Sequence, residues 1–194
     1  FIREADTPHS AFVENIAQVY LQNDTNMKPV VRAVLQAPQF IEKKRFYQRY
    51  AWPVEFAVRA VKEVGYTGFS VDGMRAPLAA MGQVLFEPPD VNGWELGQGW
   101  FSTGAMLARM NFASTIAFNQ RFLLAAAAAG AKDSPEKMVA FFLDRLSAAP
   151  FDDRPLDELH GYLRAGAAWT GSAAQLQTEA AGLSRLIVGY AEYQ

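Results

Sequence analysis

The chain has 194 residues, of which 51% are hydrophobic and 20% charged, and its formal net charge at pH 7 is −2. This balance is typical of a globular protein with a sizeable core, and the dispersed charge argues against a surface that binds nucleic acid. The absence of cysteine excludes disulfides, thiolate nucleophiles and cysteine–zinc sites, two histidines argue against a multi-histidine metal site, and no apolar run approaches the roughly 20 residues of a membrane span.

The first part of the chain predicts three helices, at residues 7–23, 28–38 and 53–65, from the helical spacing of apolar side chains. A Thr-Pro pair starts the first helix and Pro53 starts the third, which ends at a glycine cap. Residues 39–50 mix charged and aromatic side chains, which predicts an irregular or short helical crossing.

The second part predicts helices at residues 74–85, 102–128, 133–146, 156–163 and 172–190. The helix over 102–128 is the longest and is apolar almost all round, which is typical of a central, buried helix. No stretch alternates apolar and polar residues over the length of a strand. We therefore predict an all-α fold, a single compact multi-helix domain over residues 1–194.

A loop rich in Pro, Gly and Trp separates two of these helices at residues 81–100, and we call it the central loop. Pro88 and Pro89 stop a helix, and the Asp, Asn and Gly that follow favour turns. Because exposed aromatic surface is costly, Trp94 and Trp100 predict a long ordered loop that packs across the helix near residues 106–112.

The central loop is open to two interpretations. In the first, aromatic rings and polar groups bind a carbohydrate or peptide. In the second, the tryptophans plug the core, the Asp and Asn hydrogen-bond turn amides, and Arg109 is buried and holds carbonyls of the loop or Asp90. The candidate ligand-binding residues are Gln83, Glu87, Asp90, Asn92, Trp94, Trp100 and Arg109.

The chain offers little catalytic chemistry. Glu87 and Asp90 are spaced so that they could form the carboxylate pair of a glycoside hydrolase, but turn chemistry explains both. His9 and His160 have no Ser, Asp or second His at triad or metal spacing, no serine has the flanking glycines of a nucleophile elbow, and no glycine loop suits a phosphate. We predict no catalytic residue, metal site or cofactor.

Several stretches, taken in order, resemble one known family. They are Met27–Phe40, Trp52–Val58, Met81–Trp94, Met106–Ala113 and Leu186–Gln194. The run Gly-Gln-x-Leu-Phe-x-Pro-Pro-Asp-Val-x-Gly-Trp is long and specific, and the chain resembles the C-terminal half of the bacterial family catalogued as domain of unknown function 1800.

This resemblance implies an exported protein, periplasmic or extracellular, whose N-terminal half lies outside the 194 residues. Members are often encoded beside exported proteins that look like sulfatases or phosphatases, so the implied partners are that half and such a protein. The family has no settled activity to carry over. We therefore expect a helical interaction or scaffold module without catalysis of its own; the alternative is part of a hydrolase of extracellular polysaccharide whose site is shared with the N-terminal half.

Overall fold

The computed structural model describes residues 10–41, 50–65, 70, 72–95, 97–119, 123–147 and 151–194. Of these residues 71% are helical and none belongs to a strand, against a usual helical share of about one third. The prediction of an all-α fold is confirmed. Contacts divide the chain into two compact units, Phe1–Tyr50 and Ala51–Gln194, each described here by itself. The expectation of one domain over 1–194 stays a prediction.

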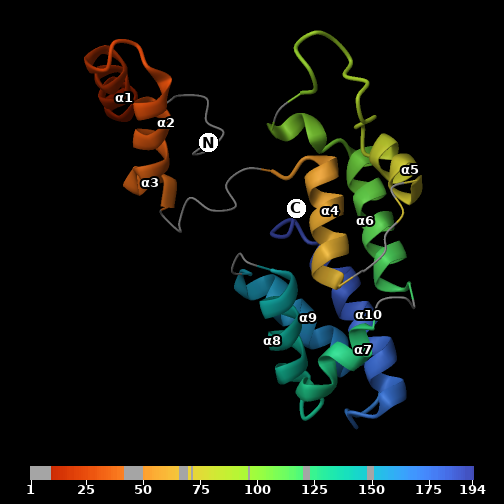
Figure 1. The fold of residues 1–194 in the computed structure, drawn as a ribbon. Helices are drawn as coiled ribbons and strands as arrows, with labels where there is room; N and C mark the ends of the chain where they lie inside the picture. The colour runs from red at the N-terminus through yellow and green to blue at the C-terminus, as the bar shows by residue number, and fades with distance from the viewer. Residues whose placement is uncertain are drawn as a thin grey trace. The chain divides into compact units, whose positions relative to one another are not determined.

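The first unit contains α1 (Ser10–Gln22), α2 (Met27–Gln36) and α3 (Pro38–Ile41) (Figure 1). The helices α1 and α2 pack against each other. The side chain of Asn26 accepts a hydrogen bond of 3.0 Å from the backbone N–H of Lys28, which fixes the start of α2. The predicted start of α1 at residues 7–8, His9, and residues 42–49 of the predicted crossing lie outside the described residues.

The second unit is built around its last helix. Its elements are α4 (Pro53–Val64), α5 (Asp72–Ala80), η2 (Gly97–Trp100), α6 (Thr103–Ala117), α7 (Leu124–Ala127), η3 (Ala128–Ala131), α8 (Pro135–Leu146), α9 (Asp153–Ala165) and α10 (Ala173–Gly189). The helix α10 packs against α6, α7, α8 and α9, while α4 and α5 pack on α6 (Figure 1). Ala180, Leu183, Ile187 and Val188 of α10 are fully buried, so α10 forms the centre of the core.

Local chemistry explains both ends of α4. Pro53 occupies the first turn, and a carboxylate oxygen of Glu55 accepts a 2.9 Å hydrogen bond from the backbone N–H of Trp52. Gly65 closes the helix at φ +94°, a left-handed conformation that glycine adopts without a steric cost. The predicted bounds of this helix are confirmed.

Two predicted helices are shorter in the structure. The helix predicted over 102–128 ends at Ala117 and is followed by the separate turns α7 and η3, so the alanine-rich stretch does not continue it. The helix predicted over 74–85 ends at Ala80, two residues before Gly82 takes a φ of +96°.

The predicted burial of the helix over 102–128 is also wrong in part. Leu107 and Met110 of α6 are 58% and 54% exposed. The all-round apolar pattern of α6 therefore does not make it the central helix, a position that α10 occupies. None of the helices in the described part of the chain is long and apolar enough to cross a membrane.

Candidate functional site

The central loop is tied to α4 where it begins. Gln83 is buried, and its Oε1 accepts a hydrogen bond of 2.9 Å from the backbone N–H of Val54. The first turn of a helix leaves its N–H groups without intrahelical acceptors, and Gln83 supplies one of them from 29 residues away. Its role in the structure is therefore to anchor the loop to α4.

The end of the loop is anchored by an aromatic pair. Trp100 is 4% exposed, and its ring centroid lies 5.9 Å from that of Trp52, with the planes tilted by 41°. This separation suits two indole rings in contact. Trp94 is half-buried, so of the two tryptophans Trp100 is the one that fills the core.

The tip of the loop presents apolar side chains to solvent. The backbone N–H of Glu87 donates to the carbonyl of Val84 at 3.2 Å, which closes a tight turn. Within this turn Phe86 has a φ of +65° and is 94% exposed, and Val91 is fully exposed. Apart from glycine, few residues adopt a left-handed backbone, and for a bulky side chain it is an outlier. Sequence reasoning placed neither residue among the candidates.

The polar residues of the tip make a turn. A carboxylate oxygen of Asp90 accepts a 2.7 Å hydrogen bond from the backbone N–H of Asn92, and the N–H of Gly93 donates to the Asp90 carbonyl at 3.1 Å. Glu87, Asp90 and Asn92 are exposed. The turn chemistry predicted for Asp90 is confirmed.

A cavity of about 390 Å³ lies beside the loop. Both tryptophans of the loop line it, together with Glu95, Met81 and Pro89. The structure therefore brings Trp94 and Trp100 to one cavity, and it adds Glu95, which the sequence analysis did not single out. A signal was present in the sequence, because Glu95 directly follows Trp94.

Arg109 belongs to α6 and not to the central loop. Its side chain is fully buried, and its Nη2 donates to the carbonyl of Ala51 at 2.8 Å. The guanidinium carbon lies 5.0 Å and 4.7 Å from the ring centroids of Phe56 and Phe101, within the range of cation–π contact. The prediction that Arg109 is buried is confirmed, and the prediction that it holds Asp90 or loop carbonyls is wrong.

The environment of Arg109 is costly for a cation. Its Nε and Nη1 are buried without a hydrogen-bond partner. Burial lowers the pKa of Arg109 from its usual value of 12.5 to about 10, so the side chain still carries its charge at neutral pH. Its two aromatic neighbours and one carbonyl hold it as a structural residue.

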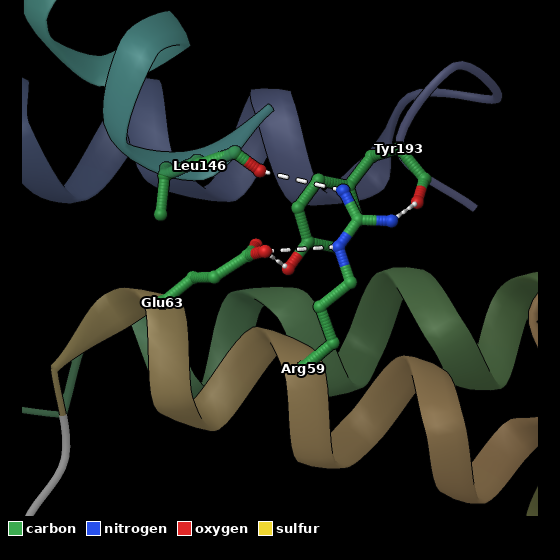
Figure 2. Close-up of polar contacts among 4 residues, drawn as sticks. All are labelled: Arg59, Glu63, Leu146 and Tyr193. Atoms are coloured by element: carbon green, nitrogen blue, oxygen red, sulfur yellow. Dashed lines mark hydrogen bonds and ion pairs between the residues drawn. The ribbon is translucent and has the colours of Figure 1, made fainter. Parts of the chain in front are cut away.

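A second polar cluster fastens the C-terminal segment to α4 and α8 (Figure 2). Nε of Arg59 lies 3.0 Å from a carboxylate oxygen of Glu63, and its Nη atoms donate to the carbonyls of Tyr193 at 3.0 Å and Leu146 at 3.5 Å. The Tyr193 hydroxyl donates to the other Glu63 oxygen at 2.6 Å. Burial first, and then this hydrogen bond, raise the pKa of Tyr193 above its usual value.

The polar groups of the described residues do not assemble an obvious reaction centre. No set of three or more His, Asp or Glu side chains among them lies close enough to hold a metal ion. His160 is half-buried, and its Nδ1 has no hydrogen-bond partner. The groups that the central loop does offer are suited to binding. They are exposed apolar side chains, exposed carboxylates and an aromatic cavity.

These features define an all-α protein with an anchored aromatic loop. The chain belongs to the family described as protein of unknown function (DUF1800), whose model matches residues 1–194. The family resemblance read from the sequence is confirmed. No curated protein and no solved structure matches the chain.

Proposed function

We propose that the chain is a non-catalytic interaction module that uses the tip of its central loop to contact a protein partner. The observation that carries this proposal is Phe86, which combines a left-handed backbone with 94% exposure. Each of these two properties is unfavourable for an isolated molecule.

The free-energy costs of the left-handed backbone and of the exposed ring can each be estimated. A left-handed φ costs a residue with a side chain about 1–2 kcal/mol. A phenylalanine left in water also forgoes the roughly 1.5–3 kcal/mol that burial would contribute. Strained residues concentrate where binding or catalysis needs a fixed geometry. A partner that covers Phe86 would recover the second cost, which supports a contact role.

The anchors of the loop support the same role. Gln83 holds its start against Val54 in the first turn of α4, and Trp100 holds its end against Trp52, the residue before α4. A tip held at both ends loses less conformational freedom on binding than a free tip would. The two ends of the loop that carries Phe86 and Val91 are therefore held in place.

The partners that we propose follow from the family resemblance. They are the N-terminal half of the same polypeptide and an exported sulfatase-like or phosphatase-like protein, and the proposed location is the periplasm or the outside of the cell.

Site-specific photo-crosslinking tests the contact. A photoreactive phenylalanine analogue replaces Phe86 or Val91 in the native cellular background, and Leu123, an exposed residue at the start of α7, serves as the matched control. We expect positions 86 and 91 to yield the same defined adduct, identified by mass spectrometry, and position 123 to yield none. No adduct from position 86, or one adduct pattern shared by all three positions, would refute the proposal.

The second candidate is part of a polysaccharide hydrolase, and the cavity at Trp94 and Trp100 favours it, since aromatic rings stack on sugar faces. Glu87 and Asp90 would supply the carboxylates. The chain is assayed on sulfated and plain polysaccharides, with and without divalent metals. Turnover that disappears in Glu87→Gln or Asp90→Asn would favour this candidate over the interaction module.

A further inference from the structure

We infer that the cavity beside Trp94 and Glu95 is a cage for a lysine or arginine side chain of the protein partner. The inference rests on the proposed function, in which the central loop contacts a protein, and it names the chemistry that the partner must supply. Three observations carry it: the walls of the cavity, the carboxylate beside it, and the charge of the loop.

The accessible aromatic wall of the cavity is Trp94, because Trp100, which also lines it, is 4% exposed. Trp94 and Trp100 line a space of about 390 Å³, with Met81 and Pro89 among the other lining residues. The face of an indole ring carries negative electrostatic potential, and tryptophan is the best aromatic partner for a cation. The methylene stem of a lysine or arginine also packs well on apolar walls.

The carboxylate belongs to Glu95, whose side chain packs against Gly99. A methyl group at position 99 would come within 2.8 Å of the Glu95 Cβ, which is closer than real side-chain atoms approach, so the Glu95 side chain occupies the space that a larger residue would need. Glu95 is also the sole charged residue among the described residues that line the cavity. Its carboxylate can pair with a cation held against the Trp94 ring.

The charge of the whole loop has the same sign. Residues 81–100 contain Glu87, Asp90 and Glu95 and no lysine or arginine. Complementary charge speeds encounter and selects partners, so this segment favours a basic surface. A neutral sugar would stack on the Trp94 ring equally well but would gain nothing from the loop's charge. The observations therefore favour a cationic side chain.

Nuclear magnetic resonance tests the cage in the 194-residue chain, because each of its four tryptophans contributes one indole N–H signal that can be followed and assigned by substitution. The probe is the capped peptide Ala-Ala-Lys-Ala-Ala, and the control peptide carries norleucine, which keeps the stem and removes the charge. We expect the lysine peptide to shift the Trp94 and Trp100 signals saturably, with the norleucine peptide at least about fivefold weaker. Trp169, whose Nε1 donates to the Lys132 carbonyl at 2.8 Å, is the internal reference and stays unmoved.

Variants locate the interaction. Glu95→Gln should weaken binding of the lysine peptide about fivefold, while Asp144→Asn, which removes an equal charge from an exposed position on α8, should leave it unchanged. Trp94→Ala should abolish the shift at Trp100. Trp94 is chosen because it is half-buried, whereas Trp100 fills the core and its removal threatens the fold.

Three outcomes would overturn the inference: equal binding of the norleucine peptide, equal shifts at Trp169, or an unchanged affinity in Glu95→Gln. Cellobiose is titrated as a further arm, and shifts at Trp94 from this sugar without shifts from the lysine peptide would replace the cage by a sugar site. Failure of the cage is distinguishable from failure of the proposed function, because crosslinking from Phe86 does not depend on Trp94 or Glu95.

Discussion

Replacing Phe86 by glycine should make the protein more stable, against the usual effect of glycine. The substitution removes a large side chain from a backbone with φ +65°. Glycine has no Cβ and adopts this conformation as readily as a negative φ. The strain that Phe86 carries is therefore relieved without a change in the path of the loop.

The magnitude follows from three terms. Relief of the left-handed strain contributes about 1–2 kcal/mol. The greater conformational freedom of glycine in the unfolded chain lowers the stability of the variant by about 0.5–1 kcal/mol. The residual burial of the 94% exposed ring is worth roughly 0.3 kcal/mol at about 25 cal/mol per Å². The sum predicts a net gain of about 0.5 kcal/mol for Phe86→Gly.

Chemical denaturation followed by tryptophan fluorescence measures this gain, because all four tryptophans lie in residues 51–194. Phe86→Ala keeps the Cβ and the strain, so its stability should stay near that of the parent. Val91→Gly is the matched control, since Val91 is fully exposed and lies outside the left-handed region, and it should lose about 0.5–1 kcal/mol. If Phe86→Gly loses stability as Val91→Gly does, the argument from strain is refuted.

Three further predictions follow from the burial of single side chains. Trp100→Ala should cost about 3–5 kcal/mol by loss of burial and formation of a cavity, whereas Trp94→Ala should cost about 1 kcal/mol, both read from denaturation by circular dichroism; equal losses would contradict the assignment. Burial raises the pKa of Tyr193 above its usual value. Burial, followed by a hydrogen bond to Glu158, raises the pKa of Tyr190 to about 12. Their contribution to stability is full below the unfolded pKa near 10 and is lost as the pH rises, so Tyr193→Phe should flatten the fall in unfolding free energy between pH 10 and 12; an unchanged slope would contradict this. Arg109→Met should cost less than Arg109→Ala, because both remove the buried charge and only methionine fills the space; the reverse order in denaturation would contradict this packing argument.

Local chemistry accounts for the parts of the fold that the sequence predicts well. Pro53 and Gly65 mark both ends of α4 by their own backbone preferences, and no distant contact is needed. The end of α6 is different, because neither glycine nor proline follows Ala117 until Gly130. Helix propensity alone does not reveal such a division, since tertiary packing overrides it.

The candidate site also has features that neighbouring residues determine and features that distant contacts determine. The Asp90 turn follows from neighbouring residues and is predicted correctly. The sequence suggests a buried role for both tryptophans of the loop, but which one is buried depends on Trp52, which lies 48 positions before Trp100 and stacks on it. The need of Arg109 for a partner is likewise predictable, whereas its acceptor, the Ala51 carbonyl, lies 58 positions away. Pairings of this length follow from the packed core and leave no local signal.

Four of the five segments that carry the family resemblance, all within residues 51–194, meet at one place, the residues just before and within the first turn of α4. The backbone of Ala51 accepts from Arg109 and donates to the carbonyl of Gln194 at 2.8 Å, while Val54 donates to Gln83. The stretches that contain Arg109, Gln194 and Gln83 are three of those that resemble the family. Such a junction explains why short motifs far apart in the sequence occur together: each supplies one contact to the base of the loop. The tip, with Phe86 94% exposed, makes no such contribution to the base, so stabilisation of the base does not explain its place within the longest motif, whereas the partner contact proposed for Phe86 would.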